Sequence, residues 1–477
     1  MIGPVAGALL VALATDSVPR AAGVRISEPE PRRMSPVLDS SLGHGPLQPD
    51  SVQAGLARAV DRAVARGFLV ARAGARGASW SDSGPVLELQ ADPGRRFRWG
   101  GVRDAGGTRL SSEALGRLSG LPSGEVADPA DMASARSRLL STGYVEEESP
   151  PRPVMRTGSS LVDMLVHLHD RPSSSVEAAA GWTKGGSTSG YVEISLLDIL
   201  GTARDLEFGI SNGSSGTVAH GMWKEPWIGS LDLQLRLEGN LAQDTLARSL
   251  EGSAEAGWIS RDGSWEIALG LLAGRRAELA PGDTVFGPDL DEWGSRLSAS
   301  WRSEPPSAWP VDAESVRGRV EGISASADTG SSHRLRASAH VEIFRPAGPL
   351  VVRLGGDARG VWPLDASAGL SEALAPGGIG GWRGWPEGSP RTPAWAWGIA
   401  ELRIGSARSG GVVAFAEPGV RALRRQDLSW RPEPGISWGG GATLSFPGWV
   451  VELAVAARND TRDWTESLLQ VRAINRF

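Results

Sequence analysis

The C-terminal part of the chain, residues 173–477, alternates apolar and polar side chains with a period of two. In residues 231–238, four leucines alternate with Asp, Gln, Arg and Glu. Turn clusters rich in Gly, Ser, Thr and Asn, such as residues 185–190 and 211–216, separate the alternating segments. This pattern is typical of β-strands with one apolar face, and it does not fit a helical bundle. The sequence therefore predicts that this part of the chain is all-β.

A soluble all-β domain and a membrane β-barrel both produce such alternation, and the tryptophans favour the barrel. The chain has 19 Trp and 2 Tyr, and 17 of the Trp follow residue 173. Aromatic rings form girdles where the strands of a membrane barrel cross the two membrane surfaces. The tryptophans that flank strand-like segments beside turns are Trp182, Trp223, Trp227, Trp293, Trp301, Trp309, Trp362, Trp430, Trp449 and Trp464. At ~10 residues per strand plus turns, residues 173–477 hold about 14 to 18 strands.

The N-terminal residues are apolar and then irregular. Residues 1–14 end in Ala12-Leu13-Ala14, which is the pattern of a signal-peptide cleavage site. No Lys or Arg precedes this segment, so a misassigned start is the alternative. Residues 15–48 are interpreted as a linker, with one strand predicted at residues 23–27. The chain has no Cys, which excludes disulfides, thiolate zinc sites and a cysteine nucleophile, and which is consistent with export.

Two copies of a small α/β module are predicted between the linker and the all-β region. In each copy, helical periodicity ends at a Gly-aromatic pair, Gly67-Phe68 or Gly143-Tyr144, and strand-like alternation follows. The order of elements is β-α-α-β-β. We place the first module at residues 49–94, or from near residue 23 if the early strand belongs to it, and the second at residues 95–172.

This order of elements resembles the POTRA domain of the outer-membrane assembly superfamily. Three further segments resemble the BamA/TamA superfamily, and the first is the early-barrel element with an acidic-Pro-aromatic core. Here it is formed by Glu225, Pro226 and Trp227. The resemblance implies α+β POTRA-like modules (βααββ) followed by an all-β transmembrane barrel of 16 antiparallel strands, at residues 173–477.

The second segment resembles the (V/L)RG(F/Y) tip of the family's sixth extracellular loop, which folds back into the barrel lumen. It consists of Gly381, Trp382, Arg383, Gly384 and Trp385. A buried arginine needs a charge partner, and a guanidinium suits bidentate contact with carboxylates. The resemblance places the acidic partners on the next two strands, which implies that Arg383 pairs with Glu401 and Glu417. The family more often has Asp-x-Gly where this chain has Glu417-Pro418-Gly419.

The third segment is the end of the chain. Leu469, Val471 and Ala473 alternate with polar residues, and the chain ends on Phe477. A terminal aromatic residue after an alternating strand resembles the β-signal that the outer-membrane insertion machinery reads. An edge strand that ends in Phe is the structural alternative. Ile474 stands where the family often has Gly, and Asn475 interrupts the apolar face.

The resemblance implies an assembly or translocation factor in the bacterial outer membrane, with its POTRA-like modules in the periplasm. Its partners would be outer-membrane lipid, unfolded β-barrel or secreted client proteins, and a periplasmic or inner-membrane accessory protein. POTRA edges would receive β-rich clients by strand addition, and the barrel would insert them through the seam between its first and last strands. The alternatives are a two-partner-type secretion pore, which passes a client through the lumen, and a passive porin-like barrel.

We expect no enzymatic activity, cofactor or metal. No phosphate loop of the Walker type and no H-E-x-x-H motif is present in the sequence. His167 and His169 share one strand face without further ligands at metal-binding spacing. The net charge of −6 gives no global basic field, so we expect no nucleic acid partner.

Overall fold

The computed structural model of the chain describes residues 23–27 and 49–476, with gaps between some elements. The gaps are residues 82–83, 172–173, 183–187, 214–215, 230, 245–246, 261–262, 279–288, 304–311, 328–329, 363–380, 386–391, 407–409, 425–429, 447–448 and 460–467. Phe477 lies outside the described residues. No helix among the described residues is long and apolar enough to cross a membrane.

The described residues of the first N-terminal module form a three-stranded sheet and one helix. Its elements are β1 (Gly23–Ser27), α3 (Pro49–Val64), β2 (Arg72–Ser81) and β3 (Gly84–Asp92). The strand order is β1-β3-β2, with β1 parallel to β3 and β2 antiparallel to it. Ala59 and Ala63 of α3 are buried with Ala91 of β3, because small side chains let the helix approach the sheet closely. Gly67 ends the helical segment with φ +89°, a conformation that favours glycine.

The second module has the β-α-α-β-β order that the sequence predicts. Its elements are β4 (Arg98–Asp104), α4 (Ser112–Ser119), α5 (Pro129–Ser141), β5 (Val145–Met155) and β6 (Leu161–Asp170). The strand order is β4-β6-β5, so β6 is central and β5 is an edge strand. Trp99, Val162 and Met164 are buried in its core, and Trp99 Nε1 donates to Asp131 at 3.3 Å.

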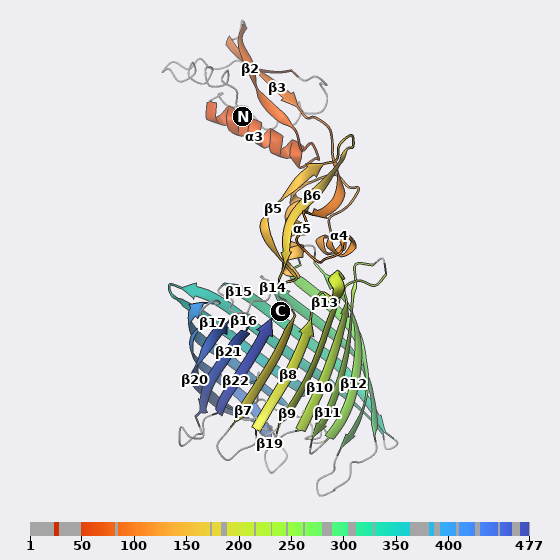
Figure 1. The fold of residues 1–477 in the computed structure, drawn as a ribbon, viewed down its shortest axis with the longest axis vertical. Coiled ribbons are helices and arrows are strands. Elements are labelled where there is room, and N and C mark those ends of the chain that lie inside the picture. Colours follow the sequence, from red (N-terminus) through yellow and green to blue (C-terminus); the bar gives the residue numbers. More distant parts are fainter. Residues whose placement is uncertain are drawn as a thin grey trace. The chain divides into compact units, whose positions relative to one another are not determined.

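The remaining strands form a closed barrel of 16 antiparallel strands, as predicted. Consecutive strands pair all the way round, and β22 closes the barrel by pairing with β7 beside it (Figure 1). The strands are β7 (Ser175–Trp182), β8 (Thr188–Leu196), β9 (Asp205–Gly213), β10 (Gly216–Glu225), β11 (Gln234–Asp244), β12 (Ala247–Ile259), β13 (Trp265–Glu278), β14 (Leu290–Arg302), β15 (Ala313–Ala327), β16 (Gly330–Ala347), β17 (Leu350–Trp362), β18 (Ala394–Ser406), β19 (Gly410–Arg424), β20 (Trp430–Phe446), β21 (Trp449–Arg458) and β22 (Leu468–Arg476).

The barrel presents its apolar side chains outward. On β13, Leu269 and Leu271 are 65% and 71% exposed, whereas their neighbours Ala268 and Leu272 are buried. A soluble β-sandwich would bury the leucine face, so this surface fits contact with lipid. Exposed tryptophans near strand ends fit the predicted girdles, and they are Trp258, Trp265, Trp293, Trp362 and Trp449. Trp309 and Trp464 lie outside the described residues, as do the side chains of Trp182 and Trp430.

One predicted strand start differs from the structure. The leucine alternation begins at Leu231, but β11 begins at Gln234. Leu231 instead forms an isolated bridge with Ile228, and its N–H donates to the Ile228 carbonyl oxygen at 3.0 Å. This bridge lies outside the ladder between β10 and β11, which runs from Glu225 with Leu235 to Gly216 with Asp244. Alternation alone therefore predicted the strand three residues too early.

The barrel wall has a short side and a long side. The seam between β22 and β7 has eight paired residues, and β8 with β9 has seven. On the opposite side, β12 with β13 has 13 pairs and β15 with β16 has 15. The seam also differs from the other pairs because its strands come from the two ends of the barrel sequence.

Candidate functional site

The segment Gly381–Trp385 lies inside the barrel, although it belongs to the connection between β17 and β18. Trp382 is completely buried, and its Nε1–H donates to the carbonyl oxygen of Glu417 on β19 at 2.9 Å. Gly384 has φ +82°, and a Cβ there would lie 3.2 Å from the Ser437 side chain. A glycine is therefore required both by the backbone conformation and by the close approach to the wall.

Arg383 pairs with both of the acidic residues that the sequence predicts for it. Its backbone N–H donates to Glu417 Oε2 at 2.9 Å, and its Nε contacts the other oxygen of the same carboxylate. Its Nη1 lies 2.8 Å from Glu401 Oε2. The side chains of Glu401 and Glu417 are each 2% exposed. These contacts connect the loop to β18 and β19; that they retain the loop in the working protein stays a prediction.

Three further side chains complete this arrangement, and the sequence analysis missed them. Arg353 Nη1 lies 3.5 Å from Glu401 Oε2, and Arg403 Nε contacts the other oxygen of Glu401. The guanidinium of Arg383 stacks on the ring of Phe415 at 3.6 Å from the centroid. Because Arg353 and Phe415 both lie opposite Glu401 in the ladder, only the strand register could have identified them. We call Arg353, Arg383, Glu401, Arg403, Phe415 and Glu417 the Arg383 cluster.

A group of indole rings packs beside the Arg383 cluster. Trp382 and Trp385 contact each other with 4.9 Å between ring centroids, and Trp395 and Trp397 stack at 4.3 Å. All four rings are buried together with Ile399. These tryptophans thus have a different role from the girdle, because they fill the lumen rather than mark a membrane surface. The alternation in Trp395-x-Trp397-x-Ile399 was the available signal, since it places three apolar side chains on one strand face.

The wall also provides space and charge for the loop indoles. A Cβ on Gly435 would lie 2.9 Å from the Trp385 ring and 3.0 Å from the Trp382 ring. The guanidinium groups of Arg421 and Arg458 lie 4.3 and 4.9 Å from the centroid of Trp385. Cation–π contacts of this kind are strongest where water is excluded. The segment Gly381–Trp385 therefore contacts the wall through close packing, stacked rings and ion pairs.

The other two predicted motifs do not contact Arg383 in the described part of the chain. Glu225 is the last residue of β10 and accepts from Arg204 at 2.8 Å, while Pro226 and Trp227 follow in the connection. On β22, the residues Leu469, Val471 and Ala473 pair with β7 across the seam. Their role as an insertion signal stays a prediction, and Phe477 lies outside the described residues.

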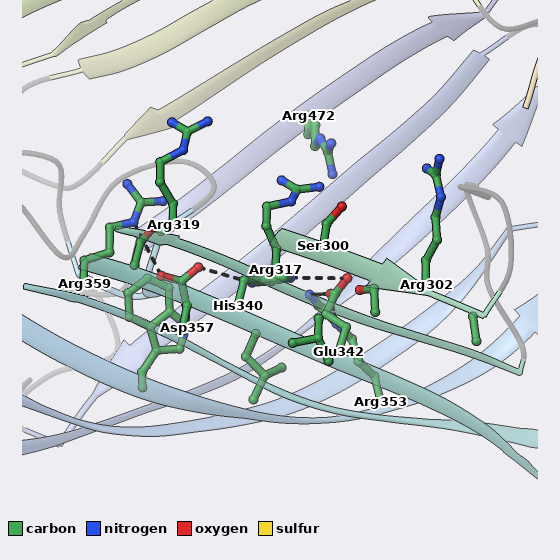
Figure 2. A pocket seen from close by; sticks show the side chains of 18 of the residues that line it. Ser300, Arg302, Arg317, Arg319, His340, Glu342, Arg353, Asp357, Arg359 and Arg472 are labelled. Carbon is green, nitrogen blue, oxygen red and sulfur yellow. Dashed lines mark hydrogen bonds and ion pairs between the residues drawn. The ribbon is translucent and has the colours of Figure 1, made fainter. Parts of the chain in front are cut away.

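The lumen contains a cavity of about 1150 Å³ that is lined mainly by charged and small polar side chains (Figure 2). Glu207 and His220 line it and lie next to Glu193 on a third neighbouring strand, with His220 Nε2 at 3.7 Å from Glu193 and 3.5 Å from Glu207. Their potential ligand atoms lie within 4.8 Å of one another, so this group could hold a metal ion. No sequence motif indicated it, because each residue comes from a different strand. His169 instead lies 3.3 Å from Glu146.

The sequence also contains two G-x-S-x-G stretches, which are residues 209–213 and 435–439. In esterases this motif forms a sharp turn between a strand and a helix. Here both stretches lie within strands, namely β9 and β20. Neither one forms a nucleophile elbow.

Comparison with solved structures identifies the fold. BamA from Haemophilus ducreyi lacking POTRA domains 1–3 is 14% identical with a TM-score of 0.56, over 96% of this chain and 100% of that chain. CdiB from Acinetobacter baumannii is 11% identical with a TM-score of 0.60, over 98% and 91%. CdiB from Escherichia coli is 14% identical with a TM-score of 0.57, over 97% and 92%. No family model and no curated protein sequence matches the chain. The chain thus has the fold of the BamA/TamA superfamily, as its motifs predict.

Proposed function

We propose that this chain, with its BamA/TamA fold, is an outer-membrane protein that inserts β-rich client proteins through the seam of its barrel. The outward apolar surface supports a membrane location, and the likeness to BamA and CdiB supports a role in the transport or insertion of proteins. The N-terminal modules would then lie in the periplasm. The proposed activity is strand exchange and requires no catalytic group.

The observation that carries this proposal is the seam, where the first and the last strand of the barrel pair with each other. Eight residues of β22 pair with β7, as many as pair β7 with β8 or β21 with β22, but no hairpin turn connects β22 and β7. In lipid, each backbone group left unpaired costs several kcal/mol, so the seam cannot simply open. A client strand that pairs with β7 or β22 as they separate would replace the lost hydrogen bonds. The short side of the barrel is the place where the fewest bonds must be exchanged.

The N-terminal modules would provide edge strands for clients. The edges of the two described sheets include β2 and β5. β5 carries Pro150, Pro151 and Pro153, and proline has no N–H to donate to an added strand. Backbone N–H groups alternate sides along a strand, so at least one of two adjacent prolines faces the open edge. β2 has no proline, and we propose it as the edge that receives extended clients.

A second candidate function is secretion of a client through the lumen. The observation that favours it is the charged cavity, together with the likeness to CdiB. In this case the segment Gly381–Trp385 would have to leave the lumen, because the Arg383 cluster and four indoles occupy part of it. A passive porin-like barrel is the third possibility.

Depletion of the protein in its own cells distinguishes the three functions. Quantitative proteomics of the outer membrane should show the loss of several β-barrel proteins if the chain inserts clients. Loss of one secreted protein, with the other barrels unchanged, would indicate the secretion pore. Unchanged outer-membrane and secreted proteins with altered solute uptake would indicate a porin.

A further inference from the structure

The arginines of the barrel lumen fall into two groups. Most of them contact carboxylates, and the densest example is Arg296, which lies within 2.7 to 3.4 Å of carboxylate oxygens of Glu238, Glu251, Glu255 and Glu321. Arg302 and Arg317 differ, because neither has an ion pair within the described ranges. Both line the cavity, as do Arg319 and Arg359.

The strand register gathers these four arginines on one wall. Arg302 lies opposite Ser315, so it is diagonal to Arg317, and Arg319 follows Arg317 on the same strand face. Ser338 on β16 lies opposite Arg319 on one side and opposite Arg359 on the other, so the two arginines are two strands apart at the same level of the wall. Neighbouring strands lie ~4.8 Å apart and residues rise ~3.3 Å along a strand, so the four side chains start within a patch about 20 Å across. Figure 2 shows them side by side along the wall, with Arg317 between Arg302 and the pair Arg319 and Arg359. We call them the lumen arginine patch.

The acidic residues of this wall already have other cationic partners. Asp357 accepts from His340 at 3.2 Å, and Glu342 contacts both His340 and Arg353. Arg319 donates a hydrogen bond to Glu238 at 3.4 Å and Arg359 pairs with Asp357 at 3.5 Å, so the excess charge comes from Arg302 and Arg317. The patch therefore keeps an excess of positive charge next to an open cavity. Such a concentration of like charges is unfavourable by itself, and an anion would offset it.

The donors of the patch indicate the chemical class of the anion. Each guanidinium has five N–H donors in a planar fork, whereas one carboxylate accepts about four hydrogen bonds. Four guanidiniums thus have many more N–H donors than a single carboxylate on a client chain can accept from. The hydroxyls of Ser300, Ser315 and Ser338 line the same cavity and add neutral donors. Arginine forks with interleaved hydroxyls suit a tetrahedral oxyanion with several charged oxygens.

We propose that Arg302, Arg317, Arg319 and Arg359 form a lumen binding site for an oxyanion of the phosphate class, either free or as a phosphomonoester. This site goes beyond the proposed insertion function and does not depend on it. It lies on β14, β15 and β17, whereas the seam lies between β22 and β7.

Isothermal titration calorimetry of the full chain in detergent tests the proposal, with inorganic phosphate and glycerol 3-phosphate as separate probes. We expect saturable binding that weakens as KCl increases. The double variant Arg302→Gln/Arg317→Gln should weaken binding by about tenfold or more. The matched control is Arg236→Gln/Arg472→Gln, which removes the same charge from lumen arginines that are paired with Glu266 and Glu177. The control should change the affinity by less than about twofold.

Binding of either probe that requires Arg302 and Arg317 supports the site, and the two probes show whether the free or the esterified group is preferred. Absence of saturable binding to the unmodified chain would overturn the proposal. Equal affinity in the double variant, or an equal loss in the control, would also overturn it. Binding of an acidic peptide without binding of phosphate would assign the patch to clients instead. If circular dichroism shows that the double variant is unfolded, Arg317→Gln alone serves, with an expected loss of about threefold.

Discussion

Arg383 contacts the carboxylate of Glu417 with both its main chain and its side chain. The backbone N–H donates to Oε2 at 2.9 Å, and the guanidinium contacts Oε1. One buried carboxylate on β19 thus contacts both the backbone and the side chain of the segment Gly381–Trp385. Glu401 contacts the same guanidinium from the neighbouring strand, so Arg383 is paired with carboxylates on two strands of the wall.

Replacement of Arg383 by Ala should destabilise the barrel. Removal of one partner leaves Glu417 without its main cation in a buried site, and such a change costs about 3–5 kcal/mol. We expect a decrease of this size in the free energy of unfolding, measured by denaturant titration with Trp fluorescence in detergent. The control is Arg275→Ala, since Arg275 pairs with Asp291 where both side chains are exposed, and its cost should stay below about 0.5 kcal/mol. Equal costs for the two variants would contradict the account of the Arg383 cluster.

Displacement of the loop without a change of charge is a separate prediction. Gly435→Ala would place a Cβ 2.9 Å from the Trp385 ring and 3.0 Å from the Trp382 ring. The added Cβ is fixed to the backbone of β20, so the two rings must move to make room for it. We therefore expect the loop to become sensitive to added protease. Gly239→Ala is the control, since a Cβ there meets nothing within 4 Å. If both variants resist protease as well as the unmodified chain does, glycine at position 435 is not needed to seat the indoles.

The seam ion pair should contribute to barrel closure. Arg472 on β22 donates two hydrogen bonds to Glu177 on β7, at 2.7 and 2.8 Å. The arginine is 42% exposed, so we expect only about 1 kcal/mol of destabilisation from Glu177→Gln. The charge-swapped variant Glu177→Arg/Arg472→Glu should recover part of this stability, whereas Glu177→Arg alone should be the least stable. A double swap that is no more stable than the single change would show that the pair does not couple the two strands.

The two module edges should differ in their contacts with clients. Single cysteines carrying a photocrosslinker on β2 should capture an unfolded barrel protein, whereas those on β5 should not. The chain has no native cysteine, so each label reports one position. Replacement of Pro150, Pro151 and Pro153 by Ala restores the missing N–H groups and should increase capture at β5. Strong capture at β5 in the unmodified chain would contradict the proposed role of the prolines.

The sequence was sufficient for the parts of the structure that local patterns determine. Alternation and aromatic placement predicted the barrel, and the Arg383 motif predicted its contacts with Glu401 and Glu417, which the structure contains. Contacts that depend on strand register could not be predicted. Phe415 meets Arg383 only because it lies opposite Glu401, and no spacing within one strand contains this information.

The same limit explains the lumen arginine patch, and strand ends are a second limit. Arg302, Arg317 and Arg359 come from three strands whose alignment the sequence does not give. β11 begins at Gln234, whereas the alternation begins at Leu231, which bridges to Ile228 instead. Period-two patterns therefore predict which face of a strand each side chain occupies. They do not predict where the strand begins or which residues lie opposite it on the next strand.

A disulfide across the seam tests the central claim most directly. Ala178 on β7 and Ala473 on β22 lie directly opposite each other, and opposed strand residues meet the distance that a disulfide requires. The control pair is Ala254→Cys/Leu271→Cys, which joins two strands away from the seam. Insertion of an unfolded barrel client into liposomes that contain the protein would be measured by protease protection, before and after reduction. We expect oxidised Ala178→Cys/Ala473→Cys to abolish insertion and reduction to restore it, with the control active in both states. Full insertion by the oxidised seam variant would contradict insertion through the seam.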